Sequence, residues 1–142
     1  MKIRLDGVVG WDILAADIAD KLEGANDVHL ILNSSGGSIL EGLSIYEMLE
    51  AHEGRVTVQV DFAASMASVI AMAGDEIIMN EKTSLMMIHR PWSGTVGDAD
   101  EMRKTADTLD KWKECFRRFI LIGLGICLIL ILFLICLMRK RG

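Results

Sequence analysis

Apolar residues recur along the first 112 positions in short blocks that predict strands and helices in turn. Val56, Val58 and Val60 alternate with polar residues, which is the period of a half-buried strand. Other short apolar runs predict further strands, and Ser34–Gly37 is expected to form a turn after one of them. The predicted strands cover residues 2–9 (one or two short strands), 28–32, 55–61, 77–79 and 85–88.

Between these strands, apolar residues at a spacing of three or four predict helices. Leu14, Ile18 and Leu22 form one such stripe, with Asp12 as the expected N-cap and Gly24 as the stop signal. A loop that contains Pro91 precedes the last of these helices, which Asp98 is expected to cap. The predicted helices cover residues 13–22, 40–49, 63–73 and 98–112.

This order of elements favours an α/β domain with largely parallel strands. In such sheets the reactive groups gather at the carboxyl ends of the strands, where the N-termini of helices also point. The junctions between strands and helices are therefore the places to look for chemistry.

A second region begins after Trp112. Residues 119–138 form a run of 20 residues without charge or proline, long enough for a transmembrane helix. Arg117 and Arg118 precede the run and three basic residues follow it, so both ends have interfacial anchors and the orientation stays open. We expect a domain at 1–112 and a basic-flanked membrane tail at 113–142.

Charge separates the same two regions. Residues 1–112 hold 9 Lys/Arg and 19 Asp/Glu (9 − 19 = −10), whereas residues 113–142 hold 6 and 1 (6 − 1 = +5). An acidic body argues against nucleic acid as a partner. Cys115, Cys127 and Cys136 all lie in or beside the tail without a CxxC motif, which indicates neither a disulfide framework nor a zinc site. We expect no metal or cofactor, and without a signal peptide the domain is expected to be cytoplasmic.

Two strand-to-helix junctions carry candidate chemistry. The paired glycines at Gly36 and Gly37 let the backbone approach a ligand closely. Ser65, between alanines at a predicted helix start, would have an accessible hydroxyl, and the N–H group that follows it would face outward. Together the junctions could supply a nucleophile and two oxyanion donors, with His89 as general base.

Each of these features also has an ordinary structural interpretation. A serine among small residues is often only helix packing, and a Gly-Gly pair is often only a turn. His89 could be a hydrogen-bonded structural histidine, and we interpret His29 and His52 in that way.

Four ordered blocks resemble the ClpP family of serine proteases and cover nearly all of residues 1–112. The blocks are LNSSGG at 32–37, EGLSIY at 41–46, AASMAS at 63–68 and MIHRPW at 87–92. The run SVIAMAGD at 68–75 is most similar to the phage head-maturation branch. The resemblance implies a ββα spiral of the ClpP/crotonase type, rings of subunits with internal active sites, and a possible ATP-dependent unfoldase partner.

The same resemblance implies a serine endopeptidase that acts on protein or peptide substrates. It assigns Ser65 as nucleophile and His89 as base, with the N–H groups of Gly37 and Met66 as the oxyanion hole. The chain departs from the family pattern at Ser35, which replaces a proline, and at Asp61-Phe62-Ala63, which is one residue short. The family's third catalytic residue is an acid beyond the long helix, and no acid follows Glu114.

Because of that missing acid, we expect a weak or inactive enzyme, C-terminally truncated relative to the family and fused to an apolar tail. Three alternatives stay open. The chain could be an inactive, membrane-tethered remnant, or a membrane Ser–Lys protease that uses Lys82. It could also be a crotonase-like acyl-CoA enzyme, which needs two backbone N–H groups but not Ser65 and His89 together.

Overall fold

The structure is a computed structural model that describes residues 1–123 of the chain. Its elements follow one another in the order that the hydrophobic pattern predicts, which confirms the α/β class. They are β1 (Lys2–Val9), α1 (Ala15–Leu22), β2 (Val28–Gly37), α2 (Ile39–Glu50), β3 (Val56–Ala64), α3 (Met66–Ala71), β4 (Glu76–Met79), β5 (Leu85–Met87) and α4 (Ala99–Gly123).

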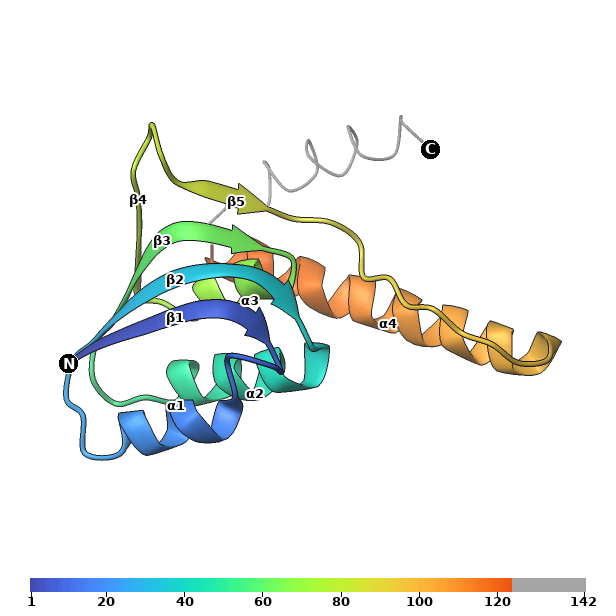
Figure 1. Cartoon of the computed structure of the whole chain (residues 1–142), viewed down its shortest axis with the longest axis horizontal. Coiled ribbons are helices and arrows are strands. Elements are labelled where there is room, and N and C mark those ends of the chain that lie inside the picture. Colours follow the sequence, from blue (N-terminus) through green and yellow to red (C-terminus); the bar gives the residue numbers. More distant parts are fainter. Residues whose placement is uncertain (124–142) are drawn as a thin grey trace.

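All pairings in the five-stranded sheet are parallel. The strand order is β1-β2-β3-β4, and β5 pairs with the carboxyl end of β3 beyond the point where β4 stops. Helices α1, α2 and α3 cover one face of the sheet (Figure 1). The carboxyl ends of β1, β2 and β3 therefore meet at one edge of the molecule.

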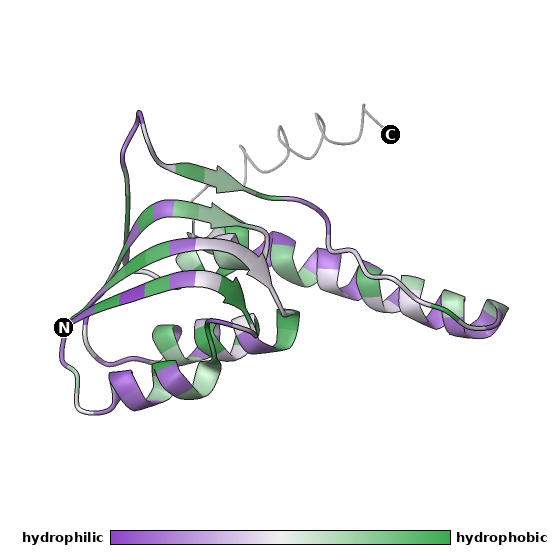
Figure 2. Cartoon of the chain, in the orientation of Figure 1, coloured by the Kyte–Doolittle hydropathy of each residue, from purple (hydrophilic) through white to green (hydrophobic). Residues whose placement is uncertain are grey.

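The core lies between this face of the sheet and the three helices. Alternate residues of the strands point inward, as their period of two requires, and pack against apolar residues of the helices. Figure 2 shows hydrophobic and hydrophilic residues following one another along these strands and helices. The largest fully buried apolar side chains are Ile18, Leu30, Leu32, Ile45, Leu49, Ile70, Val9, Val56, Val58 and Val60.

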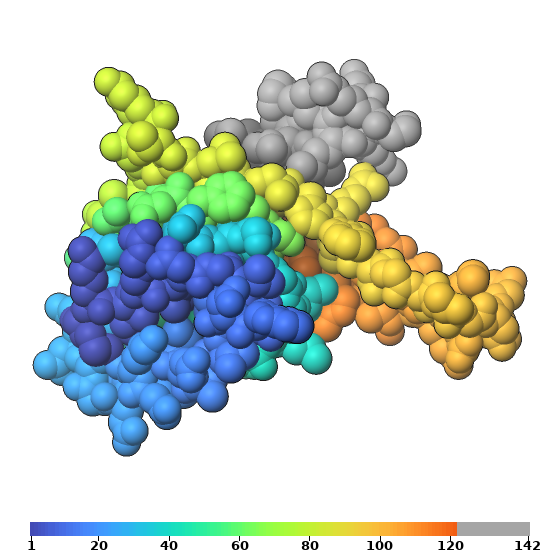
Figure 3. Space-filling model, in the orientation of Figure 1, coloured from blue at the N-terminus to red at the C-terminus, as the bar shows by residue number. Residues whose placement is uncertain are grey.

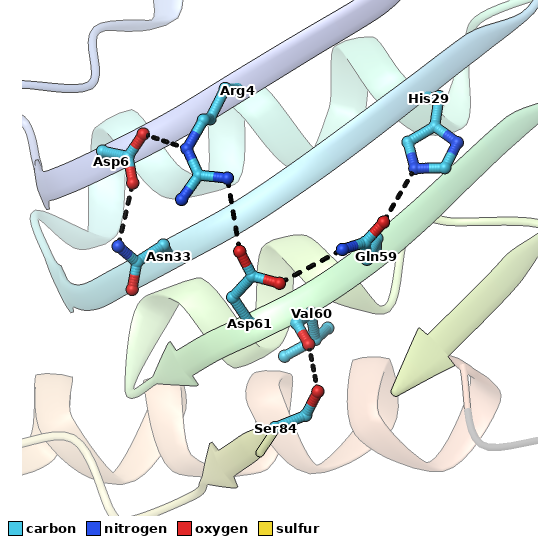
Figure 4. A network of polar contacts seen from close by, with 8 residues as sticks. All are labelled: Arg4, Asp6, His29, Asn33, Gln59, Val60, Asp61 and Ser84. Atoms are coloured by element: carbon cyan, nitrogen blue, oxygen red, sulfur yellow. Dashed lines mark hydrogen bonds and ion pairs between the residues drawn. The ribbon is translucent and has the colours of Figure 1, made fainter. Parts of the chain in front are cut away.

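The opposite face of the sheet is polar. Asp6 accepts hydrogen bonds from Arg4 Nε at 2.7 Å and from Asn33 Nδ2 at 2.8 Å, and Arg4 also contacts Asp61 (Figure 4). The Asn33 hydrogen bond, followed by that of Arg4, holds the pKa of Asp6 below its usual range. His29 contributes to this face as well, through a hydrogen bond to Gln59.

Near the candidate site, two boundaries differ from the sequence-based prediction. Ser34–Gly37 is not a turn, because β2 pairs with β1 as far as Gly37. Strand β3 continues to Ala64, so α3 begins at Met66 and not at residue 63. The small residues at 34–37, predicted as a turn, and at 63–64, predicted as helix, instead extend β2 and β3. Strand pairing satisfies their backbone N–H and C=O groups.

The expected N-cap at Asp12 is wrong. Its carboxylate accepts a hydrogen bond from the Val8 N–H at 2.8 Å, and α1 begins later, at Ala15, whose N–H donates to Glu41 Oε2. The cap at Asp98 is confirmed, since its Oδ1 accepts from the backbone N–H of Glu101. Glu101 Oε2 in turn accepts from the Asp98 N–H, which completes a capping box.

Helix α4 continues past Trp112 to Gly123. Residues 91–112, here called the arm, comprise the loop before α4 and the first half of the helix. The arm projects from the body of the molecule (Figure 3). The second half of α4 packs on the core through Phe116, Phe119 and Ile120. Within residues 1–123, no helix combines the length and the apolar character that a bilayer span requires. Most of the predicted span at 119–138 lies outside the described residues.

Candidate active site

A cavity of about 310 Å³ lies at the carboxyl ends of β1, β2 and β3. Gly37, Ser65, Met66 and His89, the four residues singled out from the sequence, all line it. They come from three separate segments of the chain, namely the end of β2, the β3–α3 junction and the segment after β5. Parallel pairing of the strands brings these segments together, because it aligns the strand ends at one edge.

Ser65 occupies the junction between β3 and α3 in a strained conformation. It is the only non-glycine residue with positive φ among residues 1–123, with φ 55° and ψ −124°. Its N–H donates to the Met87 carbonyl at 2.9 Å, which ties the junction to β5. Strain of this kind costs about 1–3 kcal/mol and concentrates at functional sites, where the surrounding structure holds it in place.

Gly36 permits a close approach of β2 to this junction. A Cβ atom at Gly36, which has φ +89°, would lie 2.7 Å from Ser65 Cβ and 2.8 Å from Met66 N. Its own N–H donates to Ser34 Oγ at 3.1 Å. The Gly36 backbone is therefore pressed against the junction at Ser65, and any side chain at Gly36 would displace it.

Both strands that lead into the site carry an extra residue. The pairing of β1 with β2 shifts at Ser35, and the pairing of β2 with β3 shifts at Asp61. Such bulges bend a strand and re-aim the residues that follow it, and they are over-represented beside active sites. They coincide with two of the three places where the sequence departs from the family pattern.

His89 follows β5, which ends at Met87, one residue earlier than the predicted strand. Its side chain is exposed, and its Nδ1 lies 2.6 Å from the Arg90 carbonyl oxygen. Across residues 1–123, no hydrogen bond joins the Ser65 hydroxyl to the imidazole. Lys82 lies in the exposed turn between β4 and β5 and does not line the cavity.

Helix α4 supplies part of the cavity wall, which the sequence reasoning missed. Phe116 and Ile120 line the cavity beside Val69 and Ile88, so its inner wall is largely apolar. The expected domain boundary at residue 112 had assigned these two side chains to the tail. Trp112, Phe116 and Ile120 recur every four residues, and this helical spacing was the available signal.

Ser68 is a second residue of the site to which the sequence analysis assigned no role. Its hydroxyl donates to the Ser65 carbonyl oxygen at 2.6 Å, and its N–H donates to the same oxygen at 3.0 Å. Only 1% of Ser68 is exposed. Its position inside the AASMAS block was the signal.

A model of the Clp protease family matches residues 13–122, which includes every residue of the cavity except Val8. The chain belongs to the Clp protease family. The match extends past Trp112, through the part of α4 that packs on the core.

Individual relatives agree with this assignment. The ATP-dependent Clp protease proteolytic subunit of Ligilactobacillus salivarius is 32% identical over 133 residues, or 87% of this chain and 66% of the relative. The subunit of Bacteroides thetaiotaomicron is 34% identical over 100 residues, covering 67% and 44%. That of Borreliella afzelii is 37% identical over 90 residues, covering 62% and 46%. The chain thus spans between about half and two thirds of the length of these relatives.

Proposed function

We propose that this Clp family member is a serine endopeptidase whose nucleophile is Ser65. The Ser65 hydroxyl attacks the scissile carbonyl while His89 takes its proton and later delivers it to the leaving amine. The N–H groups of Gly37 and Met66 stabilise the oxyanion of the tetrahedral intermediate. Water then hydrolyses the acyl-enzyme, with His89 again as base.

The observation that carries this proposal is the convergence of four residues from three segments on one cavity, around a strained serine. A packing serine would need neither the positive φ nor the glycine that lets β2 approach it. A crotonase-like acyl-CoA enzyme would not require a serine and a histidine on the same cavity. The Ser–Lys alternative is disfavoured by the place of Lys82 outside the cavity.

The level of activity depends on what orients His89. In the Ser–His–Asp triad, replacing the aspartate costs about 10⁴-fold in rate, because the imidazole takes the wrong tautomer. Here the Arg90 carbonyl accepts from Nδ1 and leaves Nε2 as the basic nitrogen. A carbonyl fixes the tautomer but carries no charge to stabilise the imidazolium. We therefore expect weak rather than absent turnover.

Cleavage of fluorogenic peptides by the full chain tests the proposal. Ser65→Ala and His89→Ala should each abolish the weak activity, whereas Ser44→Ala, at an exposed position on α2, should retain it. Activity in Ser65→Ala equal to the parent would refute the assignment of the nucleophile. Rates typical of the family would refute the expectation of weak turnover.

We extend the proposal to assembly. The ββα spiral and the ring of subunits that the family resemblance implies would place the cavity inside a chamber, with an ATP-dependent unfoldase as a possible partner. The arm supports self-association, because it exposes Trp92, Val96 and Met102 to solvent (78%, 100% and 49%). The particular similarity to the phage head-maturation branch stays a prediction, since the relatives compared above are bacterial Clp subunits.

A membrane anchor within the apolar run 119–138, in the part after Ile120, would tether a cytoplasmic protease domain to a bilayer, since Phe119 and Ile120 themselves pack on the core. The motivation is the long apolar run of the sequence, with basic residues on both sides. Alkaline carbonate extraction of membranes that contain the full chain tests this directly. Retention in the pellet supports the anchor, and release without detergent overturns it.

A further inference from the structure

The peptide unit between Ser65 and Met66 links the proposed nucleophile to one of the proposed oxyanion donors. Its carbonyl belongs to Ser65 and its N–H belongs to Met66. In a planar trans peptide these two groups point in opposite directions. Whatever fixes the direction of the Ser65 carbonyl therefore also fixes the direction of the Met66 N–H.

Ser68 holds that carbonyl. Its Oγ lies 2.6 Å from the Ser65 oxygen, and its own N–H lies 3.0 Å from the same atom. Only 1% of Ser68 is exposed although it borders the cavity, so the contact is largely shielded from water. The Ser65 oxygen thus accepts two protein hydrogen bonds inside α3.

This contact acts where the backbone is under strain. The φ of 55° at Ser65 is unfavourable for a serine and persists only if neighbouring contacts hold it. On the N-terminal side the Met87 carbonyl holds the Ser65 N–H. On the C-terminal side the carbonyl is held by Ser68.

We propose that Ser68 is a positioning residue, whose buried hydroxyl orients and polarises the Ser65–Met66 peptide so that the Met66 N–H faces the oxyanion. The proposal rests on the proposed function for its catalytic consequence. A hydrogen bond accepted by the carbonyl also strengthens the N–H of the same peptide as a donor, through cooperative polarisation.

Three substitutions separate the hydrogen bond from the volume of the side chain. Ser68→Ala removes the donor, and Ser68→Cys keeps a similar volume but donates only weakly. Ser68→Thr keeps the hydroxyl. The matched control is Ser44→Ala, because Ser44 Oγ also donates to a carbonyl within a helix, that of Leu40, and neither residue lines the cavity.

The structural readout does not depend on activity. Ser65-Met66 is the sole Ser-Met pair in the sequence. Full-length protein that carries ¹³C-carbonyl serine and ¹⁵N-methionine therefore gives a single amide–carbonyl correlation, from this peptide alone. The resonance should move in Ser68→Ala and Ser68→Cys and stay in place in Ser44→Ala. An unchanged resonance in both Ser68 variants overturns the proposal.

The functional readout is the rate at which a fluorophosphonate probe labels the chain. Loss of one hydrogen bond should slow labelling about fivefold to tenfold in Ser68→Ala and Ser68→Cys. Ser68→Thr should recover part of the rate, and Ser44→Ala should match the parent. If Ser68→Cys is labelled at the parent rate, the volume of the Ser68 side chain matters and its hydrogen bond does not, and the proposal is overturned. If the parent itself is not labelled, the proposed function fails, while the carbonyl resonance still decides whether Ser68 holds the peptide.

Discussion

The arm and the body of this molecule use the same helix in opposite ways. In the arm, the first half of α4 is mostly exposed, and an open hollow of about 480 Å³ lies between it and the start of α2. In the body, the second half of α4 closes the wall of the cavity and packs on the core. The second half of this continuous helix is therefore packed against the domain, whereas its first half is exposed to solvent.

The aromatic contacts mark where the change occurs. Phe119 packs on Tyr46 of α2 with ring centroids 4.5 Å apart, and burial raises the pKa of Tyr46, with the carboxylate of Glu50 adding to the effect. Trp112 stacks on Phe116 at 5.8 Å, at the point where the arm meets the body. The comparison shows that residues beyond 112 complete the cavity. It also shows that the arm makes fewer packing contacts than the second half of α4 does.

The largest expected effect is at the packed half of α4. Phe119→Ala removes the ring that packs on Tyr46 and should lower the free energy of unfolding by about 2–4 kcal/mol. Met102→Ala, in the arm and half exposed, should stay within about 0.5 kcal/mol of the parent. Urea unfolding measures both. Equal losses of unfolding free energy in the two variants would contradict the claim that the second half of α4 is packed and the arm is not.

Glycine substitutions give a second test of the same contrast. A Cβ at Gly42 would lie 2.2 Å from Met66 Cγ, so Gly42→Ala overpacks the interface between α2 and α3. We expect a loss of about 1–2 kcal/mol, because overpacking outweighs the gain of up to ~1 kcal/mol in helix propensity. Gly94→Ala, in the arm with open space around it, should leave the unfolding free energy nearly unchanged. Stabilisation by Gly42→Ala would count against tight packing behind the cavity.

Self-association should depend on the arm and not on the body. Met102→Glu places a charge among the exposed apolar side chains of the arm and should shift sedimentation toward smaller species, while the midpoint of thermal unfolding stays unchanged. Arg103→Glu, its exposed neighbour, is the control. An unchanged sedimentation profile in Met102→Glu would remove the arm from the interface.

The smallest effect concerns pH. The hydrogen bond and charge of Lys113 hold the pKa of Asp110 below its usual range, with Arg90 adding a lesser attraction. Because the folded-state pKa is lowered, the stabilisation is present above the unfolded value near ~3.9 and is lost as pH falls through the folded value. Asp110→Asn should flatten the acid limb of stability slightly. Asp107→Asn, which removes a carboxylate that makes no ion pair within residues 1–123, is the control.

The sequence predicted much of the fold because most of its segments show one clear period. The alternating valines of β3 and the helical stripe of Ile18 identified their elements, and Asp98 predicted the start of α4. Boundaries failed where tertiary contacts decided them. Asp12 is bound by the Val8 N–H instead of capping α1, and β2 continues through Gly37 because β1 pairs with it.

Of the site, the sequence blocks identified the four residues that meet at the cavity. Their roles stay predictions. Local pattern could not show the positive φ of Ser65, the approach of Gly36 or the inward hydroxyl of Ser68, since each depends on how β2 and β3 lie side by side. Phe116 and Ile120 were missed because the charge pattern suggested that the domain ended before them.

The central claim is that Ser65 is an activated nucleophile, and mapping of a covalent probe tests it most directly. The full chain is treated with a fluorophosphonate, digested, and analysed by tandem mass spectrometry for the modified residue. The account predicts one modified serine, Ser65, with no modification in chain that is denatured before treatment and less modification in His89→Ala. Modification spread over exposed serines such as Ser44, or no modification of Ser65 in the native chain, would contradict it.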